Sequence, residues 1–356
     1  MITMRELDTA RPTATPTGQS SERPAGPGLH LFMLDRWVRL SLSRRETTEH
    51  FQRQFVCTSP SQPQRCLLVS EPPGDKYLLR IETTEYEWSR TAGDWPQVAE
   101  MLLLADLLRR DSEHIVLHGA CLSHPAGGIC LLGAPGAGKT TLAAALAARD
   151  GFALLSDELV CTGPNGLLQT FPRKPRLDAR SRSLLRRLGI RIVREPAAEG
   201  TYLPVHPRVV ILLGNDGTER PAHLVVSGSC SRVRRIAEQF ALQCRKRGPQ
   251  WELSGSAGPE EIALAAQECW QHGVFVLGQA AHDLPNGFAA TPHLDKLRAG
   301  DGVLAALPYL RSIRNQQSPQ QLLQRLADAF AEAHFYRLQP ADITATLDLI
   351  GPILPE

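Results

Sequence analysis

The sequence predicts an α/β fold, because an apolar strand, a glycine-rich loop and a helix follow one another near the middle of the chain. The loop is GAPGAGKT, at Gly133–Thr140, and a helix-favouring segment continues over Thr141–Ala148. Before the loop, HIVLHGACLSH and ICLLG are separated by the turn-forming PAGG, as in a β-hairpin. A hairpin that leads into a loop and a helix predicts a mixed sheet.

The chain is expected to consist of a tail, a small module and a larger domain. Residues 1–28 are rich in Pro, Thr, Ser and Gly and have almost nothing to bury, so we expect a disordered tail. Residues 29–95 alternate β-favouring runs with turn formers and predict a small β-rich N-terminal module. Residues 96–356 form the expected α/β domain, beginning with a helix at Gln97–Arg110 whose leucines recur at helical spacing.

Composition excludes several classes of protein. With 356 residues, 42% of them apolar, the chain can bury one large core or two modest ones. The net charge of +2 gives no reason to expect nucleic acid or a membrane surface as a partner. We find neither a signal peptide nor an apolar stretch of roughly 18 to 20 residues, so we expect a cytoplasmic protein. The eight cysteines form no CxxC pair, and reduced thiols are expected.

The glycine loop at Gly133–Thr140 has the residue spacing of a phosphate-binding loop. Its glycines allow backbone N–H groups to close around phosphates, and the helix that follows offers its positive N-terminal end. Lys139 is the expected partner of the β- and γ-phosphates, the Thr140 hydroxyl the expected ligand of Mg²⁺, and Thr141 an expected neighbour of the α-phosphate. The sequence therefore predicts binding of a nucleoside triphosphate. The residues expected to contact it here are Gly133, Ala134, Pro135, Gly136, Ala137, Gly138, Lys139, Thr140 and Thr141.

An acidic pair, Asp157 and Glu158, ends the apolar run Phe152–Leu155. We expect this run to be a buried parallel strand with the carboxylates at its C-terminal end, where ligand sites collect. Asp157 follows Lys139 by 18 positions, which is enough for one helix and a return strand. This early position favours a kinase-like architecture over transporters and motors. The alternative is that Asp157 caps a turn, which explains Glu158 poorly.

The succession LHG, hairpin, GAPGAGKTT, helix and LLSDELV resembles the catalytic core of HPr kinase/phosphorylase. It is more similar to the HPr-kinase-related kinases, some of which accompany modified-peptide gene clusters. The resemblance covers residues 112–160, extends to FPRKP at Phe171–Pro175, and elsewhere rests on element order. It implies a phosphoenolpyruvate-carboxykinase-like P-loop kinase core that transfers phosphate from ATP to a hydroxyl, such as serine, of a protein, peptide or small molecule. It also implies a homo-oligomer, for which the sequence shows no interface signature.

The resemblance assigns roles to residues outside the loop. Asp157 matches the general base that takes the proton of the acceptor hydroxyl, and Glu158 matches a second carboxylate that holds Mg²⁺. His118 matches a histidine close to the phosphates, and a structural role for this strand histidine is an equal alternative. The planar guanidinium of Arg173 suits a transferring phosphoryl group, and a solvated loop arginine is the equal alternative.

The sequence departs from true HPr kinases in its Asp-Glu pair, which replaces Asp-Asp, and in a loop that ends in KTT rather than KS. Arg186–Gly189 matches only faintly the signature linked to the reverse reaction, so we expect neither HPr as acceptor nor phosphorylase activity. A second class of function stays open, a nucleotide-responsive binding module of a biosynthetic operon without phosphotransfer. Two carboxylates beside Lys139 favour the kinase, because a pure binder needs none there.

One basic segment is not explained by the catalytic motifs. Arg173–Arg194 intersperses arginines with leucines at helix-like intervals. We expect a solvated helix face, and recognition of an acidic or phosphorylated partner is the weaker alternative. The remaining histidines share no ligand spacing, so the sequence predicts no zinc site.

Overall fold

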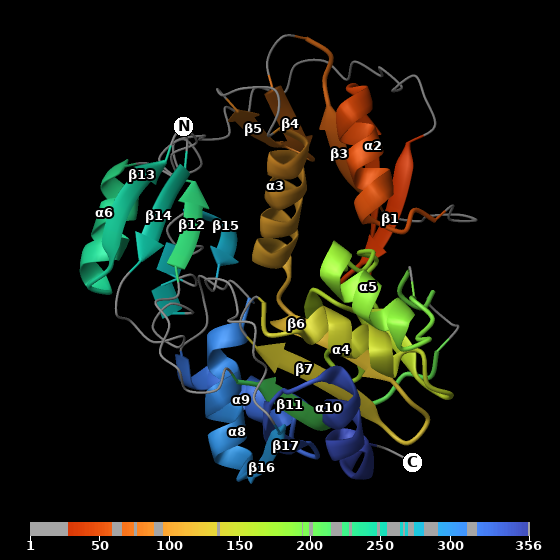
Figure 1. The fold of residues 1–356 in the computed structure, drawn as a ribbon. Helices are drawn as coiled ribbons and strands as arrows, with labels where there is room; N and C mark the ends of the chain where they lie inside the picture. The colour runs from red at the N-terminus through yellow and green to blue at the C-terminus, as the bar shows by residue number, and fades with distance from the viewer. Residues whose placement is uncertain are drawn as a thin grey trace. The chain divides into compact units, whose positions relative to one another are not determined.

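The computed structural model divides the chain into two compact units, residues 1–110 and 111–356, which are described separately (Figure 1). The tail expected over residues 1–28 lies, apart from Gly28, outside the described residues. The structure describes residues 28–58, 66–74, 77–88, 95–133, 136–193, 195–198, 202–214, 223–227, 230–247, 250–254, 264–265, 268–269, 274–280, 291–311 and 319–354.

The first unit is a five-stranded sheet with two helices (Figure 1). Its strands lie in chain order, and every neighbouring pair is antiparallel except β2 and β3. Helix α2 supplies the crossover that this parallel pair requires. The elements are β1 (Leu29–Met33), β2 (Arg36–Leu42), α2 (Arg45–Gln54), β3 (Cys66–Glu71), β4 (Tyr77–Ile81), β5 (Thr84–Trp88) and α3 (Trp95–Arg110).

Helix α3 contains the helix that the sequence predicts at Gln97–Arg110, but it belongs to the first unit. It packs mainly against α2 and β4, and the division between the units falls after Arg110 rather than before residue 96. The apolar face of α3 is buried, and burial of this face holds the helix to the small sheet. The buried residues on this face include Val98, Leu102, Leu103 and Leu107.

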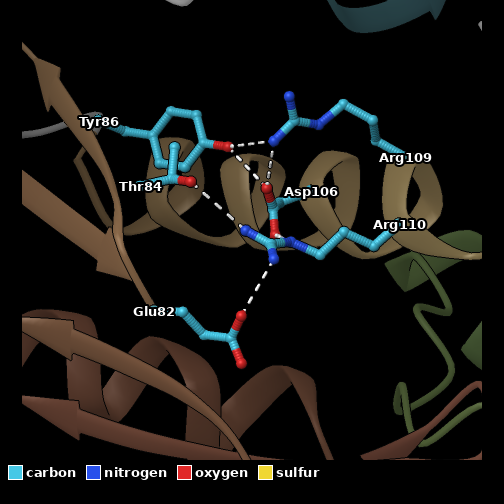
Figure 2. Close-up of polar contacts among 6 residues, drawn as sticks. All are labelled: Glu82, Thr84, Tyr86, Asp106, Arg109 and Arg110. Atoms are coloured by element: carbon cyan, nitrogen blue, oxygen red, sulfur yellow. Dashed lines mark hydrogen bonds and ion pairs between the residues drawn. The ribbon is translucent and has the colours of Figure 1, made fainter. Parts of the chain in front are cut away.

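A buried carboxylate, Asp106, ties the end of α3 to strand β5 (Figure 2). It accepts hydrogen bonds from the Tyr86 hydroxyl at 2.7 Å, from Arg109 at 2.8 Å and from the Nε of Arg110. Arg110 also reaches Glu82 at 3.1 Å. Burial, reinforced by the hydrogen bond to Asp106, raises the pKa of Tyr86, so its hydroxyl stays a donor. Asp106 therefore accepts hydrogen bonds from donors on both β5 and α3.

We expect Asp106→Asn to lower the free energy of unfolding by about 2 to 4 kcal/mol, because the amide would turn an N–H₂ group towards donors and remove the compensating charge. The control is Asp328→Asn at an exposed aspartate of the second unit. Urea unfolding followed by tryptophan fluorescence measures both variants. An Asp106→Asn protein as stable as the control would contradict this account of α3.

The second unit is built on an eight-stranded mixed sheet, as the sequence predicts in outline (Figure 1). The strand order is β10-β9-β6-β7-β11-β17-β16, and β8 pairs with β6. β7, β11 and β17 are parallel, whereas β6 and β7 form the predicted antiparallel hairpin. The strands are β6 (Ile115–Ser123), β7 (Gly128–Gly133), β8 (Ala153–Ser156), β9 (Leu159–Thr162), β10 (Leu168–Gln169), β11 (Pro207–Leu213), β16 (His293–Leu297) and β17 (His334–Gln339).

Helices cover both faces of this sheet. Alternate residues of the strands join two separate apolar clusters, one with α4, α5 and α10 and the other with α8 and α9. Residue alternation sends Ile129 and Leu131 of β7 to the first cluster and Cys130 and Leu132 to the second. The helices are α4 (Lys139–Leu146), α5 (Ala179–Arg187), α8 (Ala299–Ala306), α9 (Pro319–Ala329) and α10 (Ile343–Ile350).

Between β11 and β16 the chain forms a separate antiparallel sheet of order β13-β14-β12-β15. This sheet and helix α6 enclose their own apolar cluster around residues such as Leu224, Ile236 and Leu253. Its elements are β12 (His223–Ser227), α6 (Cys230–Gln239), β13 (Gln243–Arg247), β14 (Gln250–Ser254) and β15 (Phe275–Ala280). No helix in the described part of the chain combines the length and the apolar character needed to cross a membrane.

Candidate functional site

The glycine loop joins the buried end of β7 to the start of α4. A Cβ on Gly133 would lie 2.9 Å from the backbone oxygen of Leu213 in β11, so a larger residue does not fit there. Gly136 and Gly138 have φ of +82° and +89°, in the left-handed region that favours glycine. Ala134 and Pro135, also predicted contacts, lie outside the described residues. Glycine is thus favoured at these three positions for the steric reasons that the motif predicts.

Lys139, the first residue of α4, turns its side chain back over the loop. Its Nζ donates a hydrogen bond to the backbone oxygen of Gly133 at 2.7 Å, and the residue is 6% exposed. Burial lowers the pKa of Lys139 to about 8, and the charge of Arg311 adds to this effect, whereas Glu158 and Asp157 oppose it. The lysine therefore lies among both carboxylates and a second cation.

The acidic pair lies in the interruption between β8 and β9, two short strands that both pair with β6. β8 pairs Ser156 with Cys121 and β9 pairs Leu159 with His118, so both strands follow the same antiparallel register. The predicted strand exists, but it does not join a parallel neighbour. β6 occupies one edge of β7 through the hairpin and β11 occupies the other, and β8 pairs with the outer edge of β6.

Glycine at position 119 lets this interruption lie close to the hairpin. A Cβ on Gly119 would come within 2.6 Å of the backbone oxygen of Leu131, and its N–H donates to the backbone oxygen of Glu158 at 3.0 Å. The hydroxyl of Ser156 accepts hydrogen bonds from the N–H groups of Glu158 and Leu159. Ser156, not Asp157, thus caps the turn.

Asp157 is 6% exposed, and its Oδ2 accepts a hydrogen bond from the backbone N–H of Arg176 at 3.0 Å. Burial raises the pKa of Asp157 to about 6, and the neighbouring charge of Glu158 contributes in the same direction. The hydrogen bond from Arg176 and the charges of Arg173 and Arg176 oppose this rise. Asp157 is therefore a carboxyl group that changes its charge close to neutral pH.

Glu158 and Arg173 form an ion pair, with 3.3 Å between Oε1 and NH1. Desolvation acts to raise the pKa of Glu158, but the charges of Arg173, Arg176 and Lys139 outweigh it and hold the pKa below its ordinary value. Arg173 is 8% exposed, which disagrees with the alternative of a solvated loop arginine. The FPRKP segment thus brings a buried guanidinium to the acidic pair.

His118 of β6 lies in the same electrostatic surroundings. Burial lowers the pKa of His118 to about 3, and the cations Lys139 and Arg311 lower it further, against the opposing charge of Glu158. The imidazole is consequently neutral at physiological pH. The structure brings His118 together with the loop lysine and the acidic pair, as the active-site alternative requires.

Arg311 is a member of this site that the sequence does not reveal. It follows the 3₁₀ turn η2 (Leu307–Tyr309), and its backbone N–H donates to Val116 of β6 at 2.7 Å. Desolvation lowers the pKa of Arg311 to about 10, while Glu158 opposes the shift. Arg311 comes 172 positions after Lys139 and in no recognisable motif, so no residue spacing could have identified it. We call Lys139, His118, Asp157, Glu158, Arg173 and Arg311 the charge cluster.

The two threonines of the loop motif differ in their surroundings. Thr140 is half-buried in the first turn of α4, consistent with its predicted place beside the loop. The Thr141 hydroxyl donates a hydrogen bond to the hydroxyl of Ser181 in α5 at 2.8 Å. Thr141 therefore links α4 to α5 here, and its predicted contact with an α-phosphate stays a prediction.

The sequence predicts two oxygen donors for a magnesium ion, and this stays a prediction. They are the hydroxyl of Thr140 and the carboxylate of Glu158. Among the described residues, no three or more His, Cys, Asp or Glu side chains gather as a metal site. Mg²⁺ commonly takes only one or two protein ligands and completes its shell with phosphate oxygens and water. This donor chemistry fits Mg²⁺ bound together with a triphosphate.

A scan against protein-family models and a search of curated proteins found no match to this chain. The function must therefore be inferred from the side chains themselves. The charge cluster contains Lys139, Arg173 and Arg311 as cations against Asp157 and Glu158 as acids, with a neutral His118 between them. An excess of buried positive charge beside a glycine loop suits a polyanionic ligand.

The raised pKa of Asp157 predicts a pH-dependent cost to stability. In the folded state the pKa is about 6, against 3.8 for the ordinary group, so the folded protein binds the proton more tightly. The stabilisation that comes from this tighter proton binding is fully present below the ordinary pKa and is lost as pH rises through about 6. Above that pH the buried carboxylate destabilises the fold. Asp157→Asn should therefore be more stable than the parent near pH 8, by at most about 3 kcal/mol.

Urea unfolding near pH 8 and near pH 4 measures this difference, which should shrink to a small fraction of its size at the lower pH. Asp348→Asn, at an exposed aspartate of α10, is the matched control and should show no such trend. A destabilised Asp157→Asn protein near pH 8 would mean that the carboxylate is stabilising, against this account.

Proposed function

We propose that this protein is an ATP-dependent kinase that transfers the γ-phosphate to a hydroxyl group of a protein, peptide or small molecule. The observation that carries the proposal is the placement of Asp157, a buried carboxyl between β8 and β9 that is oriented by the Arg176 N–H at 3.0 Å and lies in the charge cluster with the loop lysine, Lys139. Its pKa, which burial raises to about 6, supports the role of a base. A general base works best when its pKa lies near the working pH. A module that only binds a nucleotide has no need of such a group.

The proposed fold of the second unit is a phosphoenolpyruvate-carboxykinase-like P-loop core. Its support is the order of elements: the β6–β7 hairpin, the glycine loop, α4, and then β8 with the acidic pair. The charge of Asp157 acts to raise the pKa of Lys139 although 18 positions separate the two residues. The short crossover through α4 accounts for this proximity.

Phosphoryl transfer depends on alignment and on neutralising charge, with little covalent chemistry left for the protein. In the proposed mechanism the loop N–H groups and Lys139 hold the β- and γ-phosphates. Arg173 and Arg311 stabilise the negative charge of the transferring group, in a site where water is largely excluded. Thr140 and Glu158 would hold Mg²⁺, which supplies further neutralisation of the phosphate oxygens when it is bound.

Asp157 then performs the proton transfer. The acceptor oxygen forms a bond to the γ-phosphorus, the bond between that phosphorus and the β–γ bridging oxygen breaks, and ADP leaves with the electron pair. The proton of the hydroxyl passes to the Asp157 carboxylate. The Arg176 backbone N–H, which donates to Oδ2, fixes the orientation of that carboxylate and leaves Oδ1 for the acceptor. His118, being neutral, acts as a hydrogen-bonding group and not as an acid.

Asp157→Asn should keep ATP binding and lose phosphoryl transfer, whereas Lys139→Ala should weaken both. The reason is that, of these two residues, only the lysine contacts ATP in the proposed mechanism. The measurement combines ATP binding by calorimetry with intact-mass analysis of candidate acceptors encoded by neighbouring genes. Asp348→Asn is the control and should behave as the parent does. Equal transfer by the parent and Asp157→Asn would remove the base assignment, and release of free phosphate alone would favour the nucleotide-responsive binding module.

The pH profile of kcat/KM should be bell-shaped. Activity should rise as Asp157 loses its proton through a pKa of about 6 and fall as Lys139 loses its charge through a pKa of about 8. Because kcat/KM reports the free enzyme, both limbs refer to the unliganded site. The acidic limb should be absent from the residual activity of Asp157→Asn. A profile that is flat across this range would contradict both assignments.

A further inference from the structure

Helix α5 and its flanks carry a concentration of exposed arginines whose guanidinium groups the catalytic proposal does not use. Between residues 176 and 191 the only acidic residue is Asp178, and its side chain is engaged as the helix cap by the N–H of Ser181 at 2.6 Å. The whole chain, by contrast, has a net charge of only +2. The exposed arginines of this segment are Arg176, Arg180, Arg182, Arg186, Arg187 and Arg191.

Helical periodicity divides α5 into two faces. Ser181, Leu184 and Leu185 share one side, and Leu185 is completely buried in the apolar cluster that includes α4. The other side presents four arginines to solvent. We call these four the arginine surface: Arg180, Arg182, Arg186 and Arg187.

Two hydrogen bonds hold α5 and the segment before it close to the charge cluster. The Thr141 hydroxyl of α4 donates to the Ser181 hydroxyl at 2.8 Å, directly after the glycine loop. The backbone N–H of Arg176, shortly before α5, donates to Asp157 at 3.0 Å. The arginine surface therefore has a defined position relative to the carboxylate that would accept the proton of the substrate.

We propose that the arginine surface binds an acidic segment of the phosphate acceptor, a protein or peptide with aspartates and glutamates near its reactive hydroxyl. This inference rests on the proposed kinase function and specifies its substrate class. Guanidinium groups pair with carboxylates through two parallel hydrogen bonds, and several such groups on one face select for a run of acidic residues. α5 contains no aromatic residue on which bases could stack, which disfavours single-stranded nucleic acid as the occupant.

The test compares two charge-reversed forms of the full chain. Arg182→Glu/Arg186→Glu alters neighbouring positions on the arginine surface. Arg234→Glu/Arg245→Glu makes the same change in charge at exposed residues of α6 and β13 and is the matched control. Neither pair belongs to the charge cluster, and ATP binding should remain unchanged in both.

The probes are short fluorescein-labelled serine peptides, one flanked by Asp and Glu, one by Asn and Gln, and one by Lys, together with a single-stranded oligonucleotide. Fluorescence anisotropy should show that the parent binds the acidic peptide most tightly and that added salt weakens this binding. The α5 variant should lose about tenfold or more in affinity for it, and the control variant should not. Arg182→Gln/Arg186→Gln should show a smaller loss, which separates charge from misfolding.

The inference fails if the acidic peptide binds no tighter than the neutral one, if both charge-reversed variants lose affinity equally, or if the oligonucleotide is the preferred ligand. A loss of ATP affinity in the α5 variant would instead assign these arginines to the nucleotide. Because the readout is binding, the test remains informative if no peptide gains phosphate, a result that would count only against the kinase proposal. Transfer to acidic peptides at the parental rate by the α5 variant would overturn the docking proposal alone.

Discussion

The feature on which the proposed site depends is the enclosure of unequal charges in a largely desolvated space. Burial acts against the charged form of every ionisable group, so buried ions persist only where opposite charges and hydrogen bonds compensate them. Lys139 and Asp157 respond with pKa values moved towards neutrality, about 8 and about 6. Arg173 and Glu158 respond by pairing. Because cations exceed carboxylates in the charge cluster, a triphosphate would complete the compensation in the proposed mechanism.

The sheet accounts for the meeting of these charges. The hairpin of β6 and β7 places His118 beside the strand that leads into the glycine loop. β8 and β9 follow the outer edge of β6 in one register, and the interruption between them places the acidic pair at the level of Gly119. The 3₁₀ turn η2 then attaches to β6 through Leu117 and Leu310, which brings Arg311 to the same place. A single strand, β6, thus positions residues from three distant parts of the chain.

The sequence predicts some of this arrangement and cannot predict the rest. GAPGAGKT is informative alone, because glycines at positions with positive φ and a following helix start are local properties. The hairpin and the acidic end of β8 are likewise local. The antiparallel partner of β8 is not, since it depends on which strand already occupies the place beside β7. Arg311 and the burial of Arg173 arise from long-range packing and leave no pattern in residue spacing. Helix α3 shows the same limit, because its apolar face is predictable but the sheet that covers it is not.

The central claim is that a desolvated carboxyl near the glycine loop titrates close to neutral pH, and its pKa can be measured directly. Carbon-13 NMR of protein labelled at the aspartate carboxyl carbon, with Asp157→Asn to assign the resonance, follows the protonation of this one group. The account predicts a midpoint for Asp157 at about 6. A midpoint at or below the ordinary value of 3.8 would contradict it, because the carboxylate would then be stabilised by its surroundings and would be a poor base for a hydroxyl.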